Sequence, residues 1–384
     1  MKIVFSILLL LSPITSFCQE SLTDFDSPVT KDSVIPQKQL YATVDALAFF
    51  RDNEYSSKLS KGYSLPGTWV RPALNYDPNK NIHIEAGIHA LFFDGANKYP
   101  NYAYHDIGTW KGNQYQSGAH LLPWFRAVAK MKDVIVVLGD IYGDQYHEII
   151  TPLYNMEQIM SADPEMGAQI IVDRGGYHAD IFLNWQSYQF NLDTHQEAFT
   201  VGVTSSLRLT KEINGRINIL AQHRGGEQDV TNTGVQTLSS GSIGLDWNHK
   251  NTGKIDSFNA QVNLLGCYQQ AGKMWPFNSG YAFHGEGGMD FAKHFALRLG
   301  YVYTPKNFVS LYGNPFFSTI SIKDYNTQFK GLGTGYCSID YHHNFGENYI
   351  LGANLETFQL NTTNHSEFNF SFGLYIRVKP WFKI

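Results

Sequence analysis

Residues 82–92 read IHIEAGIHALF, a run in which apolar and polar side chains alternate from one position to the next. Because successive side chains of a β-strand point to opposite faces, this period of two places one face in apolar surroundings and the other in water. The apolar face carries Ile82, Ile84, Ala86, Ile88, Ala90 and Phe92, and the polar face carries His83, Glu85, Gly87 and His89. The run therefore predicts a strand that separates water from an apolar phase.

The same alternation recurs from Leu40 to the end of the chain, in about sixteen runs of roughly ten residues. Clear examples lie at 199–209, 255–268 and 368–378. The connections alternate between long and tight, and the tight ones fall at 77–80, 132–133, 173–176, 211–215 and 292–294. Tight turns at one rim and long extracellular loops at the other predict an all-β fold, a transmembrane antiparallel up-and-down β-barrel over residues 39–384 with its short turns in the periplasm.

The composition favours lipid, rather than water, outside this sheet. Charged residues make up 16% of the chain and aromatic residues 15%, whereas a soluble globule usually carries about 25% charged residues. A water-soluble β-sandwich also alternates, but here aromatic residues recur at both ends of the apolar faces, where Tyr and Trp settle at the level of lipid headgroups. Tyr76, Trp247, Phe258, Phe295, Tyr341 and Tyr349 fall near the tight turns, and Tyr268, Phe283, Tyr303 and Phe368 fall near the long loops. The net charge of −5 gives no basic footprint for nucleic acid.

The opposite faces of the strands carry too many charges for a dry core, because burying unpaired ions is strongly unfavourable. A barrel of about sixteen strands leaves room for water along its axis. Two roles stay open for these charges: a transverse field that selects passing solutes, or cross-strand ion pairs that neutralise one another. Because their signs are mixed, these charges do not indicate which ions would be selected. The predicted pore-lining residues are Arg71, Glu85, His89, Arg126, Asp180, Arg208, Arg224, Glu286, Arg298, Asp340, Glu356 and Arg377.

The N-terminus has the pattern of a targeting segment. Lys2 precedes an apolar run at 3–11 that is too short to span a bilayer, and small residues lead up to position 18. We therefore predict a signal peptide over residues 1–18; lipidation of Cys18 is the alternative, which the bulky Phe17 disfavours. Residues 19–38 are polar and contain two prolines, which predicts a flexible periplasmic segment.

The long loops are where specificity is expected to lie. The loop at 95–118 is rich in Tyr and Trp, and its rings either stack on sugars or pack within the loop. The loop at 144–165 carries apolar residues at i, i+3 and i+4 steps, which predicts a short helix after Pro152. Because an apolar loop is poorly placed in external water, this loop and the one at 305–330 are expected to enter the lumen, to cap its mouth or to meet a partner. The predicted constriction residues are Ile149, Leu153, Tyr154 and Met156.

An enzymatic function depends on the register of two strands. Outer-membrane phospholipases place a Ser and a His on their lipid-facing surface, and a three-residue turn at 213–215 would bring Ser205 opposite His223 here. A hydroxyl beside an imidazole is half of a nucleophile pair, but no acid or amide falls beside His223 to orient it. The sequence thus predicts no enzyme and keeps a lipid hydrolase as the less favoured alternative. It also predicts no metal site and no cofactor, and structural roles for Cys267 and Cys337.

The signal peptide, the strand count, the short turns and the alternating Phe residues of the run at 368–378 resemble those of a porin-type outer-membrane barrel of a Gram-negative bacterium. The resemblance implies a channel for passive passage of small polar solutes, constricted by its third loop. One departure is the ending Trp381-Phe382-Lys383-Ile384, which displaces the terminal aromatic that such barrels often carry. The alternative is a closed barrel that acts as a binding platform for a surface or periplasmic protein. Outer-membrane lipids are expected partners in either case.

Overall fold

The computed structural model describes residues 37–384 except 95–118, 144–146, 188–195, 226–233, 252, 325–326, 347 and 363–364. The predicted signal peptide, nearly all of the segment 19–38 and the aromatic loop at 95–118 therefore lie outside the described residues. No helix among the described residues is long and apolar enough to cross a membrane.

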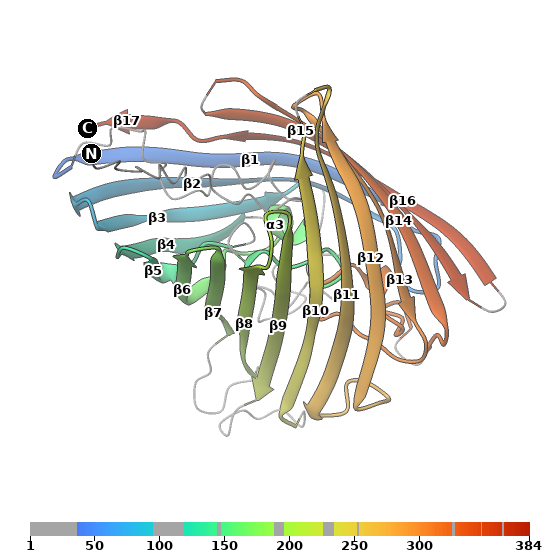
Figure 1. Ribbon diagram of the computed structural model, residues 1–384. Coiled ribbons are helices and arrows are strands. Elements are labelled where there is room, and N and C mark those ends of the chain that lie inside the picture. The colour runs from blue at the N-terminus through green and yellow to red at the C-terminus, as the bar shows by residue number, and fades with distance from the viewer. Residues whose placement is uncertain are drawn as a thin grey trace, which may run out of the picture.

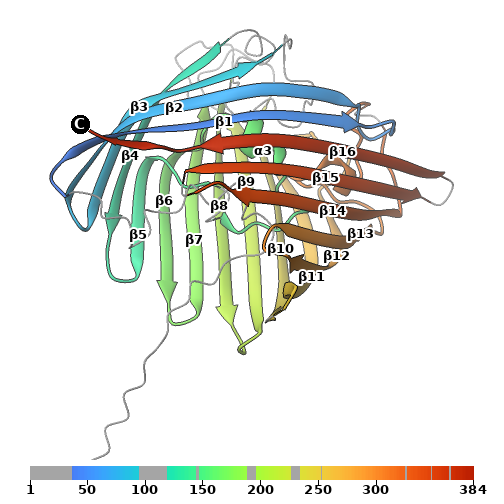
Figure 2. The same ribbon diagram turned by 90° about the horizontal axis from the view of Figure 1, so that it is seen from above.

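The chain forms a closed antiparallel barrel of sixteen long strands, as predicted (Figures 1 and 2). Each strand pairs with the next one along the chain, and β16 closes the ring on β1. The short β17 follows β16 after Pro380 and also pairs with β1. The strands are β1 (Leu40–Glu54), β2 (Tyr63–Asn79), β3 (Ile82–Phe93), β4 (Ala119–Lys130), β5 (Val134–Asp140), β6 (Met166–Arg174), β7 (Tyr177–Ser187), β8 (Glu197–Arg208), β9 (Ile213–Gly225), β10 (Gln236–Lys250), β11 (Ile255–Ala271), β12 (Ser279–Phe291), β13 (Phe295–Thr304), β14 (Leu332–Asn344), β15 (Tyr349–Thr362), β16 (His365–Val378) and β17 (Trp381–Lys383).

The predicted alternation decides which face of each strand is turned outward. In β3, His89 is fully buried inside the barrel, whereas the neighbouring Ile88 is 52% exposed on the outer wall. The outer wall carries large exposed apolar side chains on many strands, among them Leu121, Ile243, Val262 and Phe368. A soluble protein rarely exposes so much apolar surface, so hydrocarbon is the solvent of this wall.

Most connections follow the predicted pattern, and one long-loop position does not. The tight turns at 80–81, 131–133, 175–176 and 292–294 join strand pairs at the same rim. At the opposite rim, however, β15 ends at Thr362 and β16 begins at His365, so this connection is only two residues long. The alternation of long and tight connections is therefore not strict.

The turn between β8 and β9 corrects the predicted position. It lies at 209–212, and Asn214 and Gly215 are strand residues that pair with Arg208 and Leu207. The Oγ1 of Thr210 accepts hydrogen bonds from the backbone N–H groups of Glu212 (3.2 Å) and Ile213 (3.0 Å), which closes the turn earlier than an Asn-Gly turn would. The register of the two strands shifts accordingly.

The described parts of two loop segments lie inside the barrel; we call residues 141–143, 147–165, 305–324 and 327–331 together the plug. The first contains the short helix α3 (Glu157–Ser161), in agreement with the helix predicted after Pro152, and Figure 1 shows α3 within the ring of strands. The second contains the 3₁₀ turn η2 (Pro315–Phe317), all three residues of which are buried. Plug side chains Ile149, Leu153, Phe308 and Phe316 share one apolar cluster with the wall residues Phe182, Leu220, Val302 and Phe358.

The two plug segments are joined at Tyr312. This residue forms a parallel bridge with Tyr154, and its carbonyl oxygen accepts hydrogen bonds from the Asn155 backbone N–H (2.8 Å) and the Gln158 side chain (2.6 Å). Its hydroxyl group contacts Thr200 and Gln222 of the wall. The plug is therefore one packed unit that is fixed to the strands.

Inside the wall, large rings lie across glycines of the neighbouring strand. Tyr375 of β16 covers Gly352 of β15, so that a Cβ at this position would collide with the ring. We expect Gly352→Val to lower the free energy of unfolding by about 1–3 kcal/mol, because overpacking displaces the ring. Urea unfolding in detergent measures this. The matched control is Gly266→Val in β11, since a Cβ there meets no atom within 4 Å; equal losses in both variants would contradict the account.

Candidate active site on the outer wall

The predicted pore-lining residues occupy lumen-facing positions, but packed protein surrounds most of them. Arg126, Asp180, Arg298 and Arg377 are buried, while Arg208 is exposed at the turn-side end of β8. The remaining predicted positions Arg71, Glu85, His89, Arg224, Glu286, Asp340 and Glu356 are buried or half-buried. A role for this set in a conducting pore stays a prediction.

Several of these charges are paired with opposite charges elsewhere on the inner wall. Arg377 makes a two-pronged contact with Asp45, with the shorter ion pair at 2.8 Å, and Arg298 pairs with Asp290 at 2.7 Å. Arg51 is 2% exposed and contacts both Glu356 and the plug residue Glu157. Buried ions in such pairs satisfy each other's charge, which corresponds to the structural alternative raised from the sequence.

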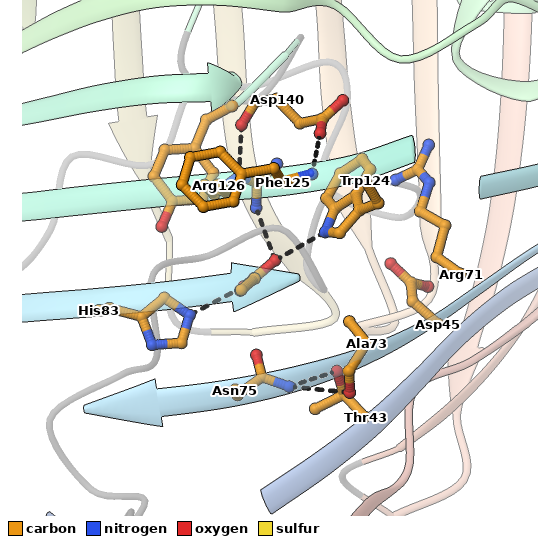
Figure 3. A network of polar contacts seen from close by, with 12 residues as sticks. Thr43, Asp45, Arg71, Ala73, Asn75, His83, Trp124, Phe125, Arg126 and Asp140 are labelled. Carbon is orange, nitrogen blue, oxygen red and sulfur yellow. Dashed lines mark hydrogen bonds and ion pairs between the residues drawn. The ribbon is translucent and has the colours of Figure 1, made fainter. Parts of the chain in front are cut away.

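A stack of alternating rings and guanidinium groups reinforces the wall at β2 and β4. The Cζ of Arg71 lies 4.1 Å from the ring centroid of Trp69 and 4.6 Å from that of Trp124. Arg126 continues the stack between Trp124 (4.9 Å) and Tyr142 (4.3 Å). The Trp124 indole donates a hydrogen bond to the Glu85 carboxylate at 3.0 Å, and the Arg126 guanidinium lies 3.9 Å from the same oxygen. Figure 3 shows Arg71, Trp124 and Arg126 of this stack. The sequence Trp-x-Arg occurs at both 69–71 and 124–126, and this repetition is the only trace of the stack in the sequence of β2 and β4.

The plug is fastened to the wall by a buried histidine. His147 is fully buried, and its Nδ1 lies 2.5 Å from Asp180 of β7 while its Nε2 lies 2.6 Å from Glu165. Burial opposes the charged imidazolium, but the attraction of Glu165 and Asp180 outweighs it and raises the pKa of His147 to about 10. A protonated His147 therefore links the first plug segment to β7 at neutral pH.

A small cavity lies between the plug and the wall. The cavity lined by Tyr154 and Asn155 of the plug and by Glu286 and Asp340 of the wall has a volume of about 30 Å³, which is room for water but not for a sugar. The predicted constriction residues Ile149, Leu153 and Tyr154 are buried in the apolar cluster, and Met156 packs against a second cluster around Trp69. In the described part of the chain, chemistry on a large substrate is better placed outside the barrel than inside.

On the outer wall the structure brings together a histidine and a hydroxyl group, although not the predicted pair. Ser205 is opposite Ile217, six residues from His223 along β9, or about 20 Å at the rise of a strand. The prediction of a Ser205–His223 pair is wrong because the turn closes at 209–212. His223 is instead opposite Thr237 of β10, and its Nδ1 lies 3.1 Å from the Thr237 Oγ1.

The His223–Thr237 pair lies at the rim that carries the long loops. His223 is two residues before the end of β9, and Thr237 is the second residue of β10. Phe199 of β8 lies next to His223 on the same face, and their ring centroids are 5.1 Å apart. Trp185 of β7 lies beyond Phe199, and the centroids of these two rings are 5.2 Å apart. Glu197 also points outward, diagonal to His223 across the β8–β9 pair. An imidazole, a hydroxyl and a carboxylate thus share one patch at headgroup level.

Other reactive groups have simpler surroundings. Cys267 is buried in the apolar cluster, where its sulfur accepts a hydrogen bond from the backbone N–H of Val309 at 3.4 Å, and Cys337 is a half-buried free thiol. Within the described ranges, no three His, Cys, Asp or Glu side chains are grouped so as to hold a metal ion.

Comparison with solved structures finds porin barrels. The crystal structure of Acinetobacter baumannii OccAB1 matches with a TM-score of 0.51 and 8% identity, over 91% of this chain and 99% of that one. Pseudomonas aeruginosa OccK11 (OpdR) matches with a TM-score of 0.51 and 9% identity, over 90% and 98%. No curated protein sequence matches the chain. The chain is thus a porin-like barrel, and with its apolar outer wall it lies in the outer membrane, as predicted.

Family membership corrects the prediction that the chain is not an enzyme. The sequence profile of the Lipid A 3'-O-deacylase-type family matches residues 29–384, which include the whole barrel. This match overturns the prediction that the chain is not an enzyme, because the whole barrel, rather than one motif, matches a family named for hydrolysis of an acyl ester. The chain belongs to the Lipid A 3'-O-deacylase-type family.

Proposed function

We propose that the chain is an outer-membrane hydrolase that removes an ester-linked acyl chain from lipid A, using His223 and Thr237. The observation that carries the proposal is the 3.1 Å contact between the His223 Nδ1 and the Thr237 Oγ1 on the lipid-facing wall, at the long-loop rim. Lipid A is a component of the outer leaflet, so its ester bonds lie at the depth of this rim. The family match supports the same substrate class.

The geometry suits nucleophilic catalysis by the Thr237 hydroxyl. With His223 protonated at Nε2, its Nδ1 accepts the hydroxyl proton as the Thr237 Oγ1 attacks the acyl carbonyl carbon. The bond between the carbonyl carbon and the sugar oxygen then breaks, and the sugar oxygen takes the proton from His223. Water, deprotonated by His223, releases the fatty acid from Thr237 and restores the hydroxyl group.

The test is hydrolysis by the purified, folded wild-type protein. We expect lipid A in detergent micelles to lose the mass of one acyl chain and an equal amount of free fatty acid to form, as measured by mass spectrometry. The amide-linked chains of the same molecule serve as an internal control and are expected to remain. Intact lipid A after prolonged incubation with correctly folded barrel would contradict the proposal.

A channel for small polar solutes is the second candidate, favoured by the porin-type barrel and by its charged inner wall. The plug opposes it, because Phe308, Phe316 and Leu153 fill the described lumen. We expect wild-type protein in planar bilayers to stay closed, without stepwise conductance. Regular conductance steps from wild-type protein would instead favour the channel.

A closed barrel that binds a surface or periplasmic protein remains a further proposal. The observation that supports this proposal is the plug, which closes the barrel. It predicts that a second protein copurifies from native membranes in a fixed ratio, whereas isolation of the barrel alone would argue against it.

A further inference from the structure

We infer that Glu197 is a positioning residue for His223. Its carboxylate accepts a hydrogen bond from the Nε2–H of the imidazole and so holds the ring in the form that the proposed reaction needs. The inference rests on the proposed function and adds the group that orients its general base. It starts from the two nitrogens of the His223 ring, which have different surroundings.

The polar contact of the His223 ring with Thr237 uses only one of the two nitrogens. Nδ1 lies 3.1 Å from the Thr237 Oγ1. Nε2 points toward Gly225 of the same strand, because a Cβ built on Gly225 would lie 3.3 Å from it. Among the residues that the structure describes, Nε2 has no hydrogen-bond partner. A group that binds Nε2 would therefore fix the orientation of the ring.

The pairing of β8 with β9 places Glu197 next to this nitrogen. Glu197 is directly opposite Gly225, on the outward face of the wall. Directly opposite residues have Cβ atoms about 4.5–5.5 Å apart, and a glutamate carboxylate lies beyond its Cβ by two further carbon atoms. Since Gly225 has no side chain, none of β9 stands between the carboxylate and Nε2. The Glu197 carboxylate can therefore reach the Nε2 of His223 by rotation of its own side chain.

The surroundings of Glu197 favour this contact. Glu197 is half-buried, and within the described ranges it has no hydrogen-bond or ion-pair partner. Phe199 covers one face of the His223 ring, and Val235 borders Gly225, with its Cγ2 3.0 Å from the same Cβ position. Apolar neighbours weaken the competition from water, and a charged acceptor makes a stronger hydrogen bond than a neutral one.

The contact decides which nitrogen of His223 carries the proton. A neutral imidazole has one N–H, and Nδ1 can accept the proton of the Thr237 hydroxyl only if that N–H is at Nε2. A carboxylate at Nε2 favours this form. When Nδ1 takes the proton, the ring becomes a cation, which the negative charge of Glu197 stabilises. Glu197 thus acts on the reaction through His223 alone.

The first test needs no substrate. Nitrogen NMR of the full-length, folded barrel in detergent at alkaline pH, with isotope-labelled histidine, shows which ring nitrogen is protonated, and His223→Gln identifies the signal. We expect the Nε2–H form in wild-type protein and a mixture of both forms in Glu197→Ala. The matched control is Glu54→Ala, because Glu54 is an exposed carboxylate at the long-loop end of β1, and it should keep the wild-type signal. A mixture in wild-type protein, no change in Glu197→Ala, or an equal change in Glu54→Ala would overturn the inference.

The second test measures acyl release and keeps the two proposals apart. We expect Glu197→Ala to lower kcat by about 10–10²-fold, part of the 10²–10⁴-fold that a general base contributes, with KM unchanged. Glu197→Gln keeps an acceptor for the Nε2–H and should recover part of this loss. If wild-type protein shows the Glu197-dependent Nε2–H form but releases no fatty acid, the contact with His223 stands and the hydrolase proposal falls. If wild-type protein and Glu197→Ala hydrolyse lipid A with the same kcat, the hydrolase stands and the positioning role falls.

Discussion

Replacing His223 with alanine is expected to lower the rate of acyl release from lipid A by about 10²–10⁴-fold, the usual contribution of a general base. The imidazole Nδ1 is the group that contacts the Thr237 hydroxyl, so its loss leaves an alcohol too weakly acidic to attack an ester. His223 is half-buried on the outer wall and takes no part in the plug, so the barrel is expected to fold normally. Fatty acid release, followed by mass spectrometry, measures the effect.

Thr237 offers the sharper comparison because its side chain can be changed without changing its shape. Thr237→Val keeps the volume and removes the hydroxyl, and should lose activity as fully as His223→Ala. Thr237→Ser keeps a hydroxyl opposite His223 and should retain activity within about tenfold. Ser205→Ala is the matched control, because Ser205 is also outward on β8 but lies opposite Ile217. Full activity in Thr237→Val, or loss in Ser205→Ala, would contradict the assignment.

The faces of the strands could be predicted from the sequence because the bilayer imposes them. In β3 and β16, every second side chain meets hydrocarbon, and the apolar residues at 82–92 and 368–378 follow that period. This local rule needs no knowledge of which strands are neighbours. The alternation therefore predicted the barrel, its two rims and the lumen-facing positions of residues such as Asp180 and Arg377.

The pairing register of the strands could not be predicted from this rule. The His223–Thr237 pair depends on that register and could not be predicted either. Which residue of β8 is opposite His223 depends on where the β8–β9 turn closes, and the Thr210 side chain closes it ahead of Asn214 and Gly215. Which residue of β10 is opposite His223 depends on the separate pairing of β9 with β10. A shift of the pairing by an even number of residues leaves the alternation intact, so the sequence pattern cannot detect it. The sequence also could not predict where the apolar loops pack, because burial in the lumen and burial against a partner would both satisfy Ile149 and Phe316.

The plug provides the second large expected effect, at His147. Removing its ring in His147→Ala should lower the free energy of unfolding by about 3–5 kcal/mol, because the fully buried Asp180 would lose its cationic partner and retain only the hydrogen bond from the Gln169 side chain (3.1 Å). The Glu165 carboxylate loses the same partner. Urea unfolding in detergent measures the change, and limited proteolysis within 148–165 shows whether the plug loosens before the barrel opens.

The matched control is another histidine–carboxylate contact in the same barrel. His178 lies 2.7 Å from Asp173 at the end of a tight turn, and Asp173 is exposed to solvent. Since an exposed pair contributes at most about 1 kcal/mol, His178→Ala should change the stability little. Equal losses in the two variants would show that the buried position of His147 is not what matters.

The same site predicts how stability depends on pH. The folded protein holds the pKa of His147 at about 10, above the ordinary value of 6.5, because Glu165 and Asp180 favour the imidazolium. The folded state therefore binds the proton more tightly than the unfolded chain does, so this contribution is complete below about pH 6.5 and is lost as the pH rises toward about 10. His147→Gln has no proton to release, and its stability should decline less over this interval than that of the wild-type protein. Parallel curves for the two proteins would mean that the imidazolium does not hold the plug in place.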